Sequence, residues 1–172
     1  MFLDFIFNLW RRLTGPLQWW TLWLVNSKFM VSVAGVVLDH DGKILLQRHR
    51  HWVPDVWGLP GGIVQSGESL ENAFAREVLE ETGLIITDIT LVRVISGYKL
   101  RLEGYLRARL EESILDPVMK IQKQEVLEAR FFPLEQLPAN ILLHHKALID
   151  RLFPPVQINA VKQCRDAIEH EK

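Results

Sequence analysis

Apolar and polar positions follow two different periods along this chain, one typical of strands and one typical of helices. Apolar and β-branched residues fill 31–38, and a polar turn at 39–42 separates this run from a second one at 43–49. The pattern predicts a strand and its antiparallel hairpin partner. Further strands are expected at 86–96, 100–110 and 126–131, where Pro133 ends the last one.

Two segments show helical spacing instead. The first runs from about Ser69 to Thr82, with a glutamate in its first turn and Gly83 where a left-handed C-cap is expected. The second runs over about 142–152 and is closed by the Pro154-Pro155 pair.

The N-terminal segment is apolar and aromatic. Helical spacing over 2–13 is interrupted by Gly15-Pro16, and 17–25 is a second apolar piece. Basic residues precede the apolar core in a secretory signal, but here Asp4 comes first and Arg11-Arg12 lie in the middle. The uncharged run 13–27 has 15 residues, fewer than the about 20 that a membrane-spanning helix needs. We therefore expect neither a signal peptide nor a full span.

Two interpretations of this extension stay open. Its four tryptophans, together with Arg11 and Arg12, suit a peripheral contact with a membrane interface. The same aromatic surface could cover the sheet of its own domain or form a homodimer contact. The protein is expected in the cytoplasm, with membrane-peripheral contact as one of these alternatives.

Composition restricts the class of protein further. With 48% hydrophobic and 24% charged residues, the 172-residue chain suits one globular domain. A net charge of -1 gives no basic field for nucleic acid. The single cysteine, Cys164, excludes an internal disulfide. We divide the chain into an extension (1–27), a core domain (28–153) and a tail expected to be helical (154–172).

Five glutamates crowd in and around the helix predicted at 69–82, beside one arginine. They are Glu68, Glu71, Glu77, Glu80 and Glu81. At about 100° per residue, Glu77 and Glu81 fall on or beside the stripe that Leu70 and Phe74 direct towards the core. Partly desolvated carboxylates cost about several kcal/mol each unless they are paired. One arginine cannot compensate five, whereas Mg²⁺ or Mn²⁺ would, and either ion normally binds substrate phosphates as well. The simpler alternative is a solvated acidic helix.

The stretch from Gly62 to Leu84 resembles the signature of the Nudix hydrolases, G-x5-E-x7-R-E-U-x-E-E-x-G-U, where U is aliphatic. All of its fixed positions are in register: Gly62, Glu68, Arg76, Glu77, Val78, Glu80, Glu81, Gly83 and Leu84. The preceding Trp57–Gly61 segment is similar to the usual lead-in. The resemblance covers about 28–153. It implies an α/β/α sandwich with a mixed sheet, to which the apolar, Trp-rich helical extension is added.

The resemblance also implies roles for these residues. The implied metal ligands are Gly62, through its carbonyl, with Glu77, Glu80 and Glu81. Glu68 is expected to steady the site, and Arg76 to orient the glutamates through hydrogen bonds. The implied activity is metal-dependent pyrophosphohydrolysis, in which water attacks phosphorus in a diphosphate linkage. The substrate would be a nucleoside diphosphate linked to another moiety, or a nucleoside triphosphate.

Residues outside this signature are interpreted from their position alone. Arg48 and Arg50 precede a Gly/Pro turn expected at 57–62, called the glycine turn below. They could bind substrate, or simply form a solvated hairpin end. Glu125 and Glu128 are candidates for a base or an additional ligand, or for a solvent-facing strand edge. Two later histidines are expected on the surface: His144 and His145.

Subclass signatures leave the substrate open. ADP-ribose hydrolases tend to have a proline about fifteen residues after the signature, where this chain has Lys99 and Leu100. A nucleotide-binding or regulatory module without turnover is the main alternative, although the intact set of glutamates argues against it. A diphosphate isomerase of the same fold would need a cysteine in the core domain, and Cys164 lies in the tail.

Overall fold

The computed structural model describes residues 7–8, 10–12, 14–96, 100–111, 119–122 and 124–154. At its centre lies a six-stranded sheet of order β4-β5-β1-β2-β6, with β3 paired to β1. The strands are β1 (Met30–Leu38), β2 (Ile44–His49), β3 (Gly61–Ile63), β4 (Ile86–Ser96), β5 (Arg101–Leu110) and β6 (Val126–Phe132). Strands β1 and β5 are parallel and the other pairs are antiparallel, so the sheet is mixed as expected. The helical tail expected after Pro154, with Cys164, lies outside the described residues.

The first two strands form the predicted hairpin, in which Leu38 pairs with Ile44. The carboxylate of Asp39 closes the turn, because it accepts hydrogen bonds from the backbone N–H groups of Asp41 and Lys43 at 3.0 and 2.8 Å. An aspartate that bonds the backbone ahead of it is a common turn device. The polar run at 39–42 is therefore an ordered turn.

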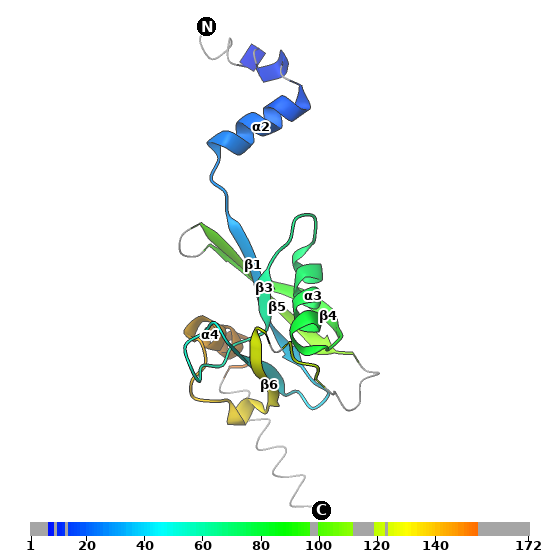
Figure 1. Cartoon of the computed structure of the whole chain (residues 1–172), viewed down its shortest axis with the longest axis vertical. Helices are drawn as coiled ribbons and strands as arrows, with labels where there is room; N and C mark the ends of the chain where they lie inside the picture. Colours follow the sequence, from blue (N-terminus) through cyan, green and yellow to red (C-terminus); the bar gives the residue numbers. More distant parts are fainter. Residues whose placement is uncertain are drawn as a thin grey trace, which may run out of the picture.

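Helices cover both faces of the sheet (Figure 1). Helix α3 (Leu70–Thr82) buries Phe74 and Val78 in one core, and α4 (Leu143–Leu152) buries its own apolar residues in a second core. Successive residues of a strand point to opposite faces. Accordingly, Leu45 belongs to the α3 core and Leu46 to the α4 core. The predicted α/β/α sandwich is confirmed.

Local signals fix both ends of α3 where the sequence predicts them. The Ser69 hydroxyl accepts from the N–H of Asn72 at 3.1 Å, as an N-cap does. Gly83 adopts φ 73° and donates its N–H to the Leu79 carbonyl at 2.8 Å. A left-handed residue at this position favours glycine. The glutamates are thereby held at fixed angles around the helix.

The glycine turn before the helix differs from expectation. Gly61–Ile63 forms β3, which pairs antiparallel with β1 through Ser32 and Ile63. Three residues that include two glycines carry no strand signal of their own, so this strand depends on its neighbour. A short 3-10 helix, η1 (Leu134–Gln136), also follows Pro133.

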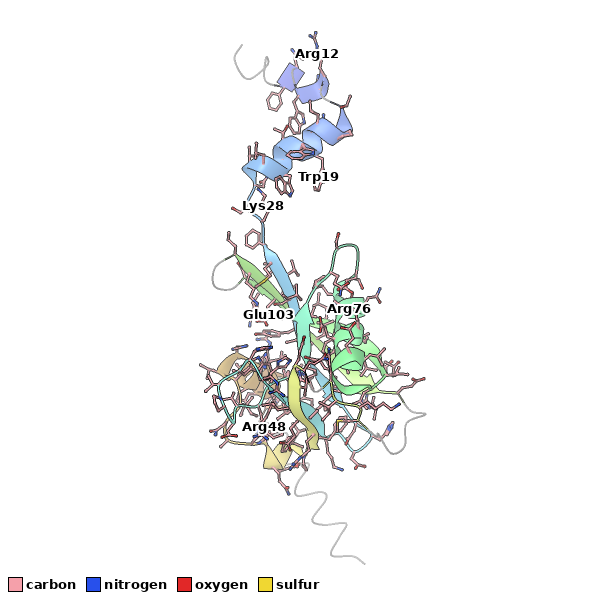
Figure 2. All side chains as sticks on the ribbon, viewed as in Figure 1. Arg12, Trp19, Lys28, Arg48, Arg76 and Glu103 are labelled. Carbon is pink, nitrogen blue, oxygen red and sulfur yellow. The ribbon has the colours of Figure 1, made fainter. Side chains whose placement is uncertain are left out.

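Helix α2 (Gly15–Val25) extends away from the sheet and has no buried residue (Figure 1). Figure 2 shows the side chains of Arg12, Trp19 and Lys28 beyond the end of the sheet. In this structure α2 does not cover the sheet, because it has no buried residue and α3 and α4 lie on the two faces. Within the described residues, no helix is long and apolar enough to cross a membrane.

Candidate active site

Helix α3 presents its glutamates to a cavity of about 490 Å³. The cavity lies against β3 and the loops that follow β2 and precede β6. Its walls include Gly62, Glu77, Glu80, Glu81, Gln122 and Glu125. The carboxylates that the sequence assigned to a metal site therefore meet in one place, and Glu125 lies there too.

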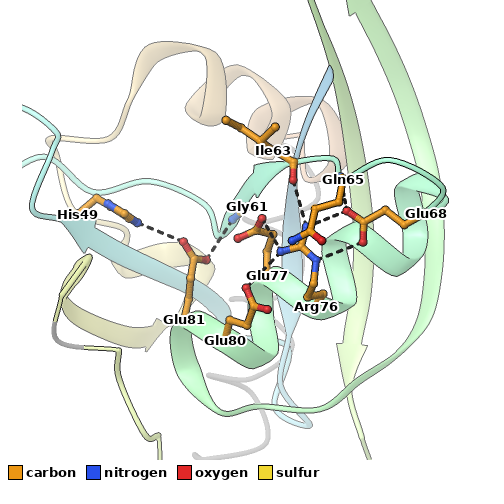
Figure 3. A network of polar contacts seen from close by, with 9 residues as sticks. All are labelled: His49, Gly61, Ile63, Gln65, Glu68, Arg76, Glu77, Glu80 and Glu81. Carbon is orange, nitrogen blue, oxygen red and sulfur yellow. Dashed lines mark hydrogen bonds and ion pairs between the residues drawn. The ribbon is translucent and has the colours of Figure 1, made fainter. Parts of the chain in front are cut away.

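Glu81 is the most enclosed of these carboxylates, at 2% exposure. One of its oxygens lies 3.2 Å from Nε2 of His49, and the other accepts a hydrogen bond from the Gly61 N–H at 3.2 Å (Figure 3). These contacts come from the end of β2 and the start of β3. Three elements thus fix the position of this buried carboxylate.

Arg76 holds the remaining glutamates in place (Figure 3). Its guanidinium donates to Glu68 at 2.8 and 3.1 Å, to Glu77 at 2.9 Å and to Glu80 at 3.1 Å. It also donates to the Ile63 carbonyl on β3 at 3.0 Å. The hydrogen bond to Glu68 is the main reason that the pKa of Arg76 is raised.

Glu68 anchors this arginine from the loop before α3. Its pKa is lowered, first by the hydrogen bond from Arg76 and then by the one from the Gln65 N–H. A carboxylate stabilised as an anion keeps its partner charged and oriented. Glu68 therefore acts on the other glutamates through Arg76.

Glu77 lies directly against the backbone of β3. A Cβ atom built on Gly62 would stand 2.3–2.5 Å from the Glu77 carboxylate, so a side chain at this position would displace the carboxylate. Burial raises the pKa of Glu77, and the charges of Glu81 and Glu80 raise it further, against the opposing effect of Arg76. Arg76 alone therefore does not balance the negative charge of these carboxylates.

This donor set fits a divalent cation. Carboxylate and carbonyl oxygens are the ligands that Mg²⁺ and Mn²⁺ prefer, and added positive charge would lower the cost of ionising Glu77. Nearby, the fully buried amide of Gln47 has no hydrogen-bond partner among the described residues. Because side chains alternate along β2, Gln47 shares the face of His49 and Leu45. The Gln47 amide therefore lies on the α3 side of the sheet, although it does not line the cavity.

Other residues singled out from the sequence lie elsewhere. Arg48 follows Gln47 and so faces the opposite side, where it pairs with Asp55 at 2.8 Å and with Glu128 at 2.7 Å. Glu128 also pairs with Arg130, so it is neutralised outside the cavity. The exposed Arg50 donates its backbone N–H to the Glu125 carbonyl at 2.7 Å.

His145 corrects an expectation. It was expected on the surface, yet it is buried at 4% exposure, because this face of α4 packs on the sheet. Its Nδ1 accepts a hydrogen bond from the Leu59 N–H at 2.9 Å. Burial lowers the pKa of His145 to about 3, with smaller effects from His144 and Arg101. His144 is exposed, as expected.

His145 lines a second cavity of about 270 Å³, which shares Trp52, Gly61 and Gly62 with the first. One ligand-type atom each from Glu103, His144 and His145 lie within 4.8 Å of one another. A neutral imidazole that accepts at Nδ1 carries its hydrogen on Nε2 and has no second lone pair for a metal. This trio is therefore better suited to hydrogen bonding than to holding a cation.

Three comparisons with known proteins agree with this geometry. A model of the NUDIX domain matches residues 28–152. The ADP-ribose pyrophosphatase of Methanocaldococcus jannaschii is 36% identical over 123 residues, covering 70% of this chain and 71% of that protein. Nucleoside diphosphate-linked moiety X motif 6 of Xenopus laevis is 41% identical over 73 residues, covering 37% of this chain and 34% of that protein.

A likeness to solved structures supports the fold. The MutT/nudix family protein from Enterococcus faecalis gives a TM-score of 0.66 at 20% identity, covering 87% of this chain and 72% of that one. The sheet and its two covering helices therefore belong to a known architecture.

Proposed function

The chain belongs to the NUDIX family of hydrolases, and on this premise we propose that it is a metal-dependent pyrophosphohydrolase. Its proposed substrate is a nucleoside diphosphate linked to another moiety. The observation that carries this proposal is the meeting of Glu77, Glu80 and Glu81 in one cavity, with Glu81 buried. Carboxylates in such a place are stable only beside compensating positive charge.

The proposed metal ligands are the three glutamates and the Gly62 carbonyl. Arg76 positions Glu77 and Glu80, and Glu68 positions Arg76. When bound, Mg²⁺ or Mn²⁺ would neutralise phosphate oxygens and lower the pKa of the attacking water. The hydrogen bonds from Arg76 hold the carboxylates in position before substrate binds. The site therefore has to rearrange less during the reaction.

In the proposed step, the oxygen of a water molecule forms a bond to phosphorus while the bridging phosphorus–oxygen bond breaks. The water proton passes to a carboxylate of the cavity wall, and the leaving phosphate departs as an anion. We assign the proton-accepting role to Glu125, because it lines the cavity. Glu128 is paired with Arg48 and Arg130 instead.

The second cavity suits the organic part of the substrate. It adjoins the acidic cavity at Gly61 and Gly62, so a diphosphate in the first places its substituent in the second. Trp52 offers a ring face, His145 a hydrogen-bond donor at Nε2, and Glu103 an acceptor for hydroxyl or amino groups. ADP-ribose is the first substrate to test, given the name of the archaeal relative.

We assign this reaction to residues 28–153 and treat 1–27 as a separate extension that contacts a membrane or a second copy of the chain. The tail after 153 has no proposed part in the reaction. The matched family region, 28–152, supports this division.

Hydrolysis by the full chain and by two variants tests the proposal. Glu81→Gln keeps the shape of the side chain but removes its charge, and the rate of Mg²⁺-dependent hydrolysis should fall roughly 100- to 1,000-fold. Glu71→Gln is the matched control, because Glu71 lies on the same helix and does not line the cavity. Equal rates in wild type and Glu81→Gln, with nucleotide binding retained, would favour the binding module instead.

A further inference from the structure

The N-terminal helix exposes an unusual amount of apolar surface. Seven apolar side chains of α2 are between 46% and 72% exposed: Leu17, Trp19, Trp20, Leu22, Trp23, Leu24 and Val25. Within the described residues, more than half of the large exposed apolar side chains belong to 7–30. Contiguous apolar surface of this kind marks a binding surface.

The apolar residues lie all around α2. At about 100° per residue, they leave only Gln18 and Thr21 as polar interruptions. A helix that docks in a protein groove or a coiled coil needs an apolar stripe on one side only. Apolar residues on every side suit surroundings that are apolar on every side, which a lipid layer supplies and a single protein groove does not.

The polar side chains of Gln18 and Thr21 in α2, and of Asn26 directly after it, form hydrogen bonds within the segment. The Gln18 amide donates to the Trp10 carbonyl at 2.8 Å, and the Thr21 hydroxyl donates to the Leu17 carbonyl at 2.7 Å. At the C-terminal end, the Asn26 side chain donates to the Leu22 carbonyl at 2.7 Å. Unpaired polar groups are costly in hydrocarbon, so internal pairing lowers the cost of leaving water.

The charges that flank α2 are all positive. Arg11 and Arg12 precede it, Lys28 follows it, and no acidic residue occurs between Asp4 and Asp39. The Lys28 ammonium lies 4.4 Å from the centre of the Trp23 ring. Basic residues and tryptophans at the ends of an apolar helix are typical of the headgroup region, where anionic lipids attract the cations.

The neighbouring end of the sheet adds to this surface. A strand-end patch consists of Phe29, Met30, Ile63 and Leu100, each between 44% and 58% exposed. The Met30 N–H donates to the Leu100 carbonyl, and Ile63 pairs with Ser32 of β1, so the patch surrounds the start of this strand. Figures 1 and 2 show α2 beyond this same end of the sheet.

We propose that α2 and the strand-end patch dock on the surface of a bilayer that contains anionic lipid. The 11 residues of α2 span about 16 Å at about 1.5 Å per residue, roughly half of the about 30 Å hydrocarbon core. The helix is therefore too short to cross the bilayer. It inserts into the hydrocarbon of one leaflet, with the flanking Arg11, Arg12 and Lys28 at the headgroups, and holds the hydrolase at the membrane surface.

Vesicle flotation of the full chain tests this proposal. The protein should float with vesicles of phosphatidylglycerol and phosphatidylethanolamine, and bind phosphatidylcholine vesicles more weakly. Replacing Arg11, Arg12 and Lys28 with glutamate should lower partitioning into the anionic vesicles by roughly a hundredfold or more. Added salt should weaken the wild type in the same direction.

A second variant examines the apolar part. Trp19→Ser, Trp20→Ser and Trp23→Ser in one chain should abolish flotation. The matched control replaces exposed apolar residues elsewhere, Ile85→Ser, Leu127→Ser and Leu143→Ser, and should still float. The circular dichroism spectrum of each variant in vesicle-free buffer shows whether the domain is folded. Absence of hydrolysis by a wild type that still floats would count against the proposed function alone.

Recovery of the wild type in the unbound fraction would overturn the proposal. So would equal flotation of the wild type and the triple tryptophan variant. Light scattering could instead show that the wild type is a dimer and the triple tryptophan variant a monomer. If the wild type also failed to float, the partner of α2 would be a second copy of the chain.

Discussion

In most helices of a folded domain, apolar side chains point inward and charged side chains point to solvent. Helices α2 and α3 each depart from this pattern, in opposite ways. Helix α3 directs carboxylates towards the protein interior, and Glu81 is almost completely buried there. Helix α2 directs tryptophans and aliphatic residues towards water. Each arrangement is costly on its own, so each helix needs something beyond its own residues.

The two helices differ in what the rest of the chain provides. The α3 carboxylates contact groups from distant elements: His49 from β2, Gly61 from β3, and Glu68 through Arg76. The apolar residues of α2 have no such support from the sheet. The comparison shows how a site differs from a docking surface: a site is shaped by many elements of the fold, whereas a docking surface is completed from outside.

The contact between Gly62 and Glu77 is where the carboxylate site is most sensitive. In Gly62→Ala, the new methyl group would overlap the Glu77 carboxylate and displace it. Hydrolysis should fall roughly a hundredfold, because misplacement by about 1 Å can cost that much. Gly15→Ala in α2, where a Cβ atom meets nothing within 4 Å, should keep the wild-type rate. A similar loss in both variants would contradict this account.

Arg76 tests whether orientation matters as well as charge. Arg76→Lys keeps a cation but cannot hold Glu68, Glu77 and Glu80 together, because an ammonium lacks the planar fork of a guanidinium. We expect about a 10- to 100-fold loss of hydrolysis, as for other residues that orient metal ligands. The kinetics should be measured at several Mg²⁺ concentrations. Full recovery at high Mg²⁺ would mean that Arg76 affects affinity alone.

His145 tests a buried polar group of the other core. The unfolded chain takes up a proton at His145 as pH falls through about 6.5, whereas burial keeps the folded protein neutral there down to about 3. The stabilisation is complete above about pH 6.5 and is lost as pH falls towards 3, at up to about 1.4 kcal/mol per pH unit.

The variant His145→Asn retains an acceptor for the Leu59 N–H and does not titrate. Urea unfolding of wild type and variant between neutral and acidic pH should show a shallower dependence in the variant. Parallel curves would mean that His145 is not held neutral in the folded protein.

The smallest expected effect concerns α2 in the absence of membranes. Replacing Trp19, Trp20 and Trp23 with serine should change the free energy of unfolding by no more than about 0.5 kcal/mol, because these residues pack on nothing in the domain. Phe74→Ala in the α3 core should cost about 3–5 kcal/mol. Comparable losses would show that α2 packs on the domain in solution.

Local sequence signals predicted the elements that rely on their own residues. Ser69 and Gly83 mark the ends of α3, and the helical period places Glu81 beside Phe74, as the structure shows. The hairpin of β1 and β2 follows from two apolar runs around Asp39. These features need no information from distant parts of the chain.

The features that the sequence did not reveal depend on tertiary packing. The burial of His145 requires α4 to lie on the sheet beside Leu59. Strand alternation could have assigned His49 and Arg48 to opposite faces, but only once the start of β2 was known. The second cavity, between Trp52 and Glu103, joins segments about fifty residues apart, and a single sequence gives no sign that such segments meet.

Calorimetric titration of the full chain with Mn²⁺ is the most direct test of the central claim that buried carboxylates on α3 hold a divalent cation. We expect saturable uptake, weakened by at least about tenfold in Glu77→Gln and unchanged in both Glu71→Gln and Glu103→Gln. The account would be contradicted by uptake that survives in Glu77→Gln and disappears in Glu103→Gln, because the ion would then occupy the second cavity.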